Sequence, residues 1–184
     1  MASVLLVAGN SALKAALRAK AQTMASQIQT ACMAYYNDYS VYPFSTNPAP
    51  TTQVNFGTNA TAGSTDEQNW GPLIYALCGN LNPYNPTQAP STYTPSVPNT
   101  RSIAYLSLNR SSIDANGIPL NPIAPTTPSY FNISMDPTYS GILSNVLIFS
   151  PGSMTTNQMT GGVYVWANCN SSNSTNVNWF VHSP

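Results

Sequence analysis

Charged residues are scarce in this chain. Asp, Glu, Lys and Arg make up only 5% of its 184 residues, whereas soluble proteins carry about 25%. Five basic and five acidic residues cancel, and no Lys/Arg cluster outside the N-terminal region could neutralise nucleic-acid phosphates. We therefore expect no specific nucleic-acid binding. The polar surface must consist of Asn, Ser, Thr, Gln and Tyr, and uncharged surfaces of this kind are common on secreted or assembled proteins.

Residues that carry catalytic or metal chemistry are also few. The sequence has one histidine, His182, and no HExxH, CxxC, GxSxG, phosphate-loop or dinucleotide-binding motif. Its five carboxylates are scattered, whereas calcium prefers several charged oxygens close together. We expect no enzyme activity, no metal and no cofactor; a hydrolase with a carboxylate pair is a distant alternative.

Only three cysteines are present, and the chain is long enough to fold without disulfides. Cys32 lies in the N-terminal region, while Cys78 and Cys169 lie far apart in the remainder. In an exported protein we expect Cys78 and Cys169 to pair. Three buried thiols are the alternative.

The first forty residues predict one long helix. They contain no proline before Pro43. Apolar residues recur at helical spacing at Leu13, Leu17, Ala21, Met24, Ile28, Cys32, Tyr35 and Tyr39. A helix over residues 3–39 would be about 55 Å long. Gly9 and Asn10 are poor helix formers, so we expect a kink, a melted turn or the helix start there.

The beginning of this helix combines a short apolar run with basic residues. Residues 4–8 are apolar, and Lys14, Arg18 and Lys20 follow. This order suits a membrane boundary, although the run is shorter than the ~20 residues that span a bilayer. A solvated helix face is the alternative explanation for the three cations.

The composition after Pro43 changes to Pro/Thr/Asn/Ser-rich loops alternating with short apolar or β-branched runs, which indicates turns and strands. We expect extended loops at 43–66 and 80–100, a helix at 70–79 that Gly79 closes, and turns at 114–117 and at Gly161-Gly162. The expected strands are 103–108, 129–135, 145–150, 162–167 and 177–181. The sequence therefore predicts an α+β fold, with a helical region at 1–42 packed on a small antiparallel sheet of a head at 43–184.

The end of the predicted helix resembles a known family. Residues 19–31 and the aromatic-rich segment 34–43, which leaves the helix through Tyr42-Pro43, resemble the end of the assembly helix in type IV pilins and especially in type II secretion pseudopilins. Segments 73–80, 99–106, 128–136 and 146–152 are similar, more weakly, to the middle and the C-terminal sheet of these proteins.

The sequence departs from the family in two respects that matter here. The prepilin leader, the Phe-Thr-Leu-Ile-Glu type of start and the first half of the hydrophobic span are absent, so we expect an N-terminally incomplete chain. The acidic calcium loop of many pseudopilins is poorly represented, because Asp136 is the only acidic residue after Asp114.

The resemblance implies a pilin fold and a structural subunit of an extracellular or periplasm-spanning filament. Its partners would be identical subunits, the inner membrane before assembly, and a pilus or secretion assembly machinery. Packing between subunits is expected for Val4, Leu5, Leu6, Val7, Leu13 and Leu17. Packing on the subunit's own sheet is expected for Met24, Ile28, Cys32, Tyr35 and Tyr39. The alternative is a cell-surface adhesin or carbohydrate-binding protein with a helical stalk.

Overall fold

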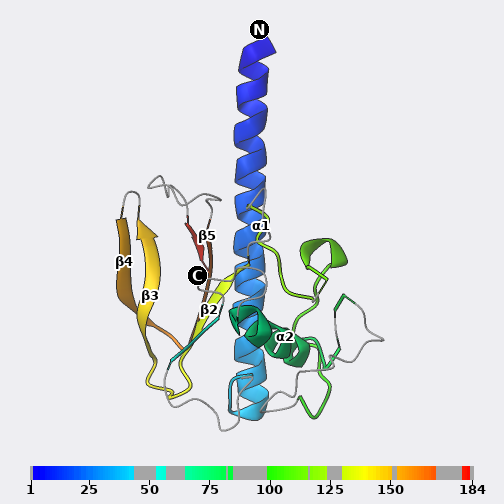
Figure 1. Ribbon diagram of the computed structural model, residues 1–184, viewed down its shortest axis with the longest axis vertical. Coiled ribbons are helices and arrows are strands. Elements are labelled where there is room, and N and C mark those ends of the chain that lie inside the picture. The colour runs from blue at the N-terminus through cyan, green and yellow to red at the C-terminus, as the bar shows by residue number, and fades with distance from the viewer. Residues whose placement is uncertain are drawn as a thin grey trace.

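One long helix runs the length of the molecule in the computed structural model (Figure 1). The structure describes residues 2–43, 53–56, 65–81, 83–84, 99–115, 117–123, 130–150, 153–168 and 180–182. Helix α1 (Ala2–Tyr39) has 38 residues and is therefore about 57 Å long. It continues straight through Gly9 and Asn10, so the break expected there is wrong. The helix formers on both sides outweigh a local cost of about 1 kcal/mol.

A four-stranded antiparallel sheet packs on the C-terminal half of α1, as the sequence predicts. Its strand order is β1-β2-β5-β6, and β5 and β6 contact α1. The strands are β1 (Val54–Phe56), β2 (Asn132–Met135), β5 (Val163–Asn168) and β6 (Phe180–His182). Ile133 of β2 lies opposite Val165 of β5, and both are buried in the core that α1 completes.

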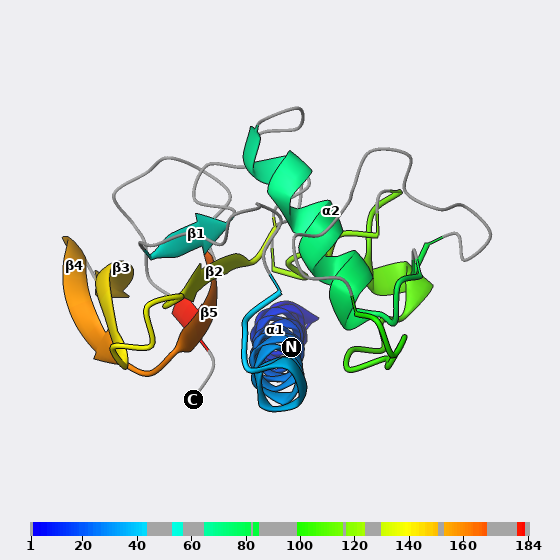
Figure 2. The same cartoon turned by 90° about the horizontal axis from the view of Figure 1, so that it is seen from below.

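A separate hairpin covers the other face of this sheet. It consists of β3 (Ile142–Ser150) and β4 (Ser153–Thr160). Leu143 and Val146 of β3 pack against Tyr164 and Trp166 of β5, whereas the alternate residues of β5 face the core with α1. Figure 2 shows the resulting layers of hairpin, sheet and α1.

Helix α2 (Thr65–Leu77) completes the core on a further side of α1 (Figure 2). It overlaps the helix predicted at 70–79, but it begins earlier, ends at Leu77 and includes Pro72. Gly79 follows it with φ +75°, and a Cβ there would lie 3.0 Å from the carbonyl oxygen of Ser102. This position therefore requires glycine both for its backbone conformation and for the close approach of the neighbouring chain.

Several predicted elements differ in the structure. Residues 103–108 form no strand, because Ala104 makes only an isolated bridge to Cys78. Gly161-Gly162 closes no hairpin, since it joins β4 to β5, which lie in different sheets. The strands expected at 129–135, 145–150 and 177–181 become β2, β3 and β6 with shifted bounds. Strands β1 and β4 and the 3-10 helix η1 (Arg110–Ser112) were not predicted.

The turn predicted at 114–117 is confirmed. The Gly117 N–H donates to the carbonyl oxygen of Asp114 over 3.1 Å. The Ile118 N–H donates to Oδ1 of the same aspartate over 2.8 Å. Gly117 has φ +84°, which explains a glycine at this position.

Candidate functional site

Helix α1 has two parts that differ in burial. From Asn10 to Lys20 no position is buried, whereas Ala21 is fully buried and begins the part that enters the core. Figure 1 shows the first part of α1 extending beyond the head. Leu13, with 59% of its surface exposed, is a large apolar side chain in this extension.

The residues predicted to pack on the sheet and those predicted to pack between subunits lie in these two parts. Met24, Ile28, Cys32 and Tyr35 are buried, and Tyr39 is partly buried against the same core. Leu13 is exposed and Leu17 is partly exposed. The remaining four positions, Val4, Leu5, Leu6 and Val7, lie in the first turns of α1.

Leu13 and Leu17 continue the stripe of α1 that faces the sheet. Counting back from Ile28, the stripe runs through Met24, Ala21, Leu17 and Leu13 in steps of three or four residues, which places them on one face of a helix. Ala21, Met24 and Ile28 are buried under the head. The apolar stripe therefore extends along α1 beyond the part that the head covers.

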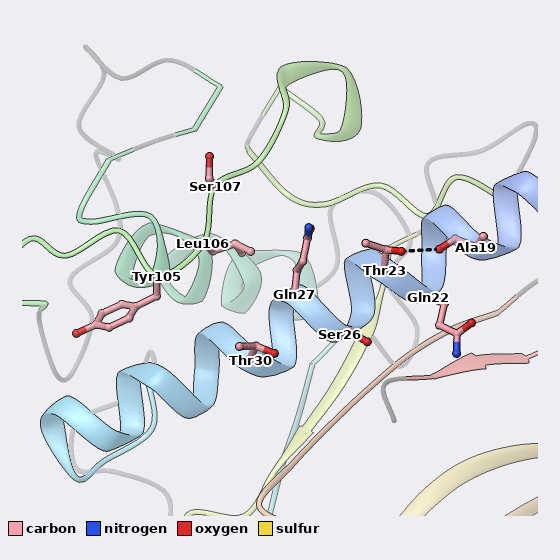
Figure 3. A pocket seen from close by; sticks show the side chains of 9 residues that line it. All are labelled: Ala19, Gln22, Thr23, Ser26, Gln27, Thr30, Tyr105, Leu106 and Ser107. Atoms are coloured by element: carbon pink, nitrogen blue, oxygen red, sulfur yellow. Dashed lines mark hydrogen bonds between the residues drawn. The ribbon is translucent and has the colours of Figure 1, made fainter.

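A groove lies beside the middle of α1 (Figure 3). Its volume is about 690 Å³. It is lined by Ala19, Gln22, Thr23, Ser26, Gln27, Thr30, Tyr105, Leu106 and Ser107. The six α1 residues recur every three or four positions and so share one face. The described residues that line the groove include no carboxylate, histidine, lysine or arginine, and their amide and hydroxyl groups can donate and accept hydrogen bonds.

The loop wall of this groove is fixed to the end of α1. The Tyr105 hydroxyl donates to Oδ2 of Asp38 over 2.6 Å, and Arg101 lies 3.6 Å from the same oxygen. The Tyr105 and Tyr35 rings meet edge to face at 5.6 Å between centroids. Burial, together with the hydrogen bond to Asp38, raises the pKa of Tyr105, so its hydroxyl stays a donor at neutral pH.

Asn99 is a fully buried polar residue that joins both helices to this loop. Its Nδ2 donates to the carbonyl oxygens of Ala76 in α2, over 2.9 Å, and of Ile103, over 2.6 Å. Its Oδ1 accepts from the Tyr39 hydroxyl of α1 over 2.8 Å. Sequence reasoning missed Asn99, because an asparagine in a Pro/Asn/Thr-rich segment has the appearance of a loop residue.

Asp136 organises the chain between β2 and β3. Its Oδ1 accepts from the N–H and hydroxyl of Thr138, over 2.9 and 2.6 Å. Its Oδ2 accepts from the Ser140 hydroxyl and the Gly141 N–H, each over 2.9 Å. Burial alone would raise the pKa of Asp136, but these four hydrogen bonds stabilise the carboxylate and hold the pKa below its usual value.

Three tyrosines connect this turn to the end of α1. Tyr36 stacks on Tyr42 at 4.8 Å, and Tyr139 lies 5.3 Å from Tyr36 and 5.9 Å from Tyr42, measured between ring centroids. The Tyr139 hydroxyl donates to the carbonyl oxygen of Ser40 over 3.3 Å. The aromatic end of α1 therefore anchors the head, including the turn around Asp136.

The cysteines offer no reactive thiolate in the described part of the chain. Cys32 and Cys78 are buried free thiols, and burial raises the pKa of both, that of Cys78 to about 12. Cys169 lies outside the described residues, and its pairing with Cys78 stays a prediction. The described residues also contain no cluster of three His, Cys, Asp or Glu side chains that could hold a metal ion.

Comparison with known proteins gives no match: no protein-family model, no curated protein and no solved structure matches this chain. Among the described residues, no helix combines the length and apolar character needed to cross a membrane.

Proposed function

We propose that this chain is a structural subunit of a type IV pilin-like filament, assembled by packing of α1 between copies. The observation that carries the proposal is the continuation of the sheet-facing stripe of α1 beyond the head, where Leu13 is 59% exposed. A long helix packed on a small antiparallel sheet is also the arrangement expected of a pilin fold.

The uncovered part of the apolar stripe favours association between copies of the chain. Removing apolar surface from water contributes about 25 cal/mol per Å², so full burial of one leucine contributes about 1.5–3 kcal/mol. Leu13 and Leu17 therefore favour contact with another apolar surface. A repeated contact between different faces of successive copies does not close on itself and builds a helical filament.

The groove supplies a second contact surface on another face of α1. Gln22, Gln27 and Thr30 can donate to and accept from a neighbouring chain without burying a charge, which would cost more. An apolar stripe and an uncharged polar groove on different faces allow each copy to contact two neighbours.

The proposed location is an extracellular filament or the cell surface. Before assembly the subunit would be held at the inner membrane, and a pilus or secretion machinery would add it to the filament. This part of the proposal rests on the resemblance of residues 19–43 to pilin and pseudopilin helices. Lys14, Arg18 and Lys20 follow the apolar start of α1, as suits a segment that leaves a membrane surface with anionic headgroups.

Electron microscopy of the full chain purified from its native cells tests the proposal. We expect thin, regular fibres from the wild type and none from Leu13→Lys, because a lysine cannot be buried unpaired between copies. Leu81 is a matched control, since it is 51% exposed and lies outside α1; Leu81→Lys should assemble normally. Circular dichroism would verify that both variants fold.

Two results would count against the proposal. If the wild-type protein stays a uniform monomer at every concentration, it does not form the proposed filament. Equal loss of fibres in Leu13→Lys and Leu81→Lys would show that α1 has no special part in assembly.

A further inference from the structure

Strand β4 forms the outer edge of the hairpin. It pairs with β3 on one side, and within the described residues no strand pairs with its other side. Both views place β4 at the periphery, away from α1 and α2 (Figures 1 and 2). Alternate residues of β4 therefore direct their backbone N–H and C=O groups outward, as on any edge strand.

This edge carries none of the features by which proteins prevent edge pairing. Such features are charged side chains, prolines within the strand, bulges and short strand length. Residues 142–160 contain no charged residue, and β4 contains no proline. The hairpin has one register irregularity, and its extra residue lies in β3, between Leu143 and Val146, rather than in β4. With eight residues, β4 is also longer than the average strand of about 5–6.

The composition of β4 favours pairing with an identical strand. In an antiparallel pair related by a twofold axis, a charged residue close to the axis faces its own copy, and like charges facing each other are destabilising. Strand β4 has the sequence SMTTNQMT and so meets no such repulsion. The exposed Gln158 and Thr160 side chains can form hydrogen bonds across the pair, as amide ladders and threonine pairs do.

We propose that β4 is a self-association edge, at which two copies of the chain pair their β4 strands antiparallel and join two hairpins into one four-stranded sheet. Up to about eight backbone hydrogen bonds would form between two strands of this length. The contact is small compared with stable interfaces of about 1,600 Å², so the pairing is weak and concentration-dependent. In a filament subunit it would link copies side by side, but it does not depend on α1.

Hydrogen exchange measured by mass spectrometry at low and high protein concentration tests this pairing. Leu13→Lys is the background, because it removes assembly through α1 and leaves β4 intact. At a concentration where half the chains are paired, alternate amides of β4 should exchange about twofold more slowly than in the monomer. Sedimentation velocity on the same samples should show a dimer.

Two double-lysine variants are compared, one with both lysines on β4 and a control with both lysines outside the hairpin. Gln158 and Thr160 are exposed on β4, whereas Thr100 and Ala115 are exposed outside the hairpin. In the same background, Gln158→Lys/Thr160→Lys should abolish dimer and amide protection, and Thr100→Lys/Ala115→Lys should keep both. Trp166 fluorescence reports whether the hairpin still covers the sheet, because Trp166 is buried beneath it.

Two outcomes would overturn the proposal. One is β4 exchange that does not change with concentration in the Leu13→Lys background. The other is protection that persists in the β4 double-lysine variant while Trp166 stays buried. Either result leaves the filament proposal untouched, since that proposal is tested by the difference between Leu13→Lys and Leu81→Lys.

Discussion

Replacing Asp136 by alanine should destabilise the head strongly. This side chain is 3% exposed and accepts four hydrogen bonds. Thr138 and Ser140 are exposed, so their hydroxyls can turn to water in the variant. The N–H groups of Thr138 and Gly141 would lose their acceptor, and each unsatisfied donor costs about 1–3 kcal/mol. Allowing for partial hydration, we expect a loss of about 2–4 kcal/mol in the free energy of unfolding.

The conservative variant Asp136→Asn removes the negative charge of this side chain and keeps its size and shape. The amide oxygen can still accept from Thr138, but the amide NH₂ group would face the N–H of Gly141, where two donors repel. We expect a smaller loss, of about 1–2 kcal/mol. Thr138→Ala removes one hydroxyl donor at the surface and serves as the mild control, with a loss near 0.5–1 kcal/mol. Urea unfolding followed by circular dichroism at neutral pH measures all three.

The pH dependence provides a second measurement of the same interaction. Because the folded pKa of Asp136 is lowered, its carboxylate stabilises the folded state at pH values above the unfolded pKa, about 3.9. This contribution is lost as the pH falls through the lower, folded pKa. Wild-type stability should therefore fall more steeply below about pH 4 than that of Asp136→Asn. Equal slopes, or an Asp136→Ala loss below about 0.5 kcal/mol, would refute the reasoning.

Two further predictions concern the remaining buried groups. Asn99→Leu should lower the free energy of unfolding by about 2–4 kcal/mol, because the carbonyl oxygens of Ala76 and Ile103 lose their donor in the core. The control is Asn109→Leu, at an exposed asparagine. In the same urea assay it should lower the free energy of unfolding by less than about 1 kcal/mol. Cys32 and Cys78 should both resist a thiol reagent in the folded protein, where both are buried, and Cys32 should react after unfolding, since burial raises its pKa in the folded state. Three reactive thiols in the unfolded, unreduced chain would exclude the Cys78–Cys169 disulfide, and one would support it.

Helix α1 and its buried face could be predicted because their signal is local. Met24, Ile28 and Cys32 recur at helical spacing and are buried where the helix meets the sheet. Strand β5 was also predictable, since Val163 and Val165 alternate with Tyr164 and Trp166, and the two sets face different cores. In both elements the period of the apolar residues equals the period of the structure.

The missed elements depend on contacts between distant segments. Strand β4 has few apolar residues to reveal a period of two, and it forms because β3 offers a partner edge. Asn99 and Asp136 look like loop residues in the sequence. Their importance comes from the carbonyl oxygens and N–H groups that the fold brings around them. No spacing rule within a single segment encodes such a set of partners.

The extent of the candidate assembly surface on α1 depends on how much of the helix the head covers, which only the fold determines. The apolar stripe through Leu13, Leu17 and Ala21 is continuous in the sequence, so its pattern does not show where burial ends. Strand β5, with six residues, is about 20 Å long, whereas α1 is about 57 Å long. Even a strand aligned with α1 would cover only about a third of that length. Another copy of α1 carries the same stripe and would match the uncovered length, so the proposed filament contact predicts that substitution of Leu13 separates assembly from folding.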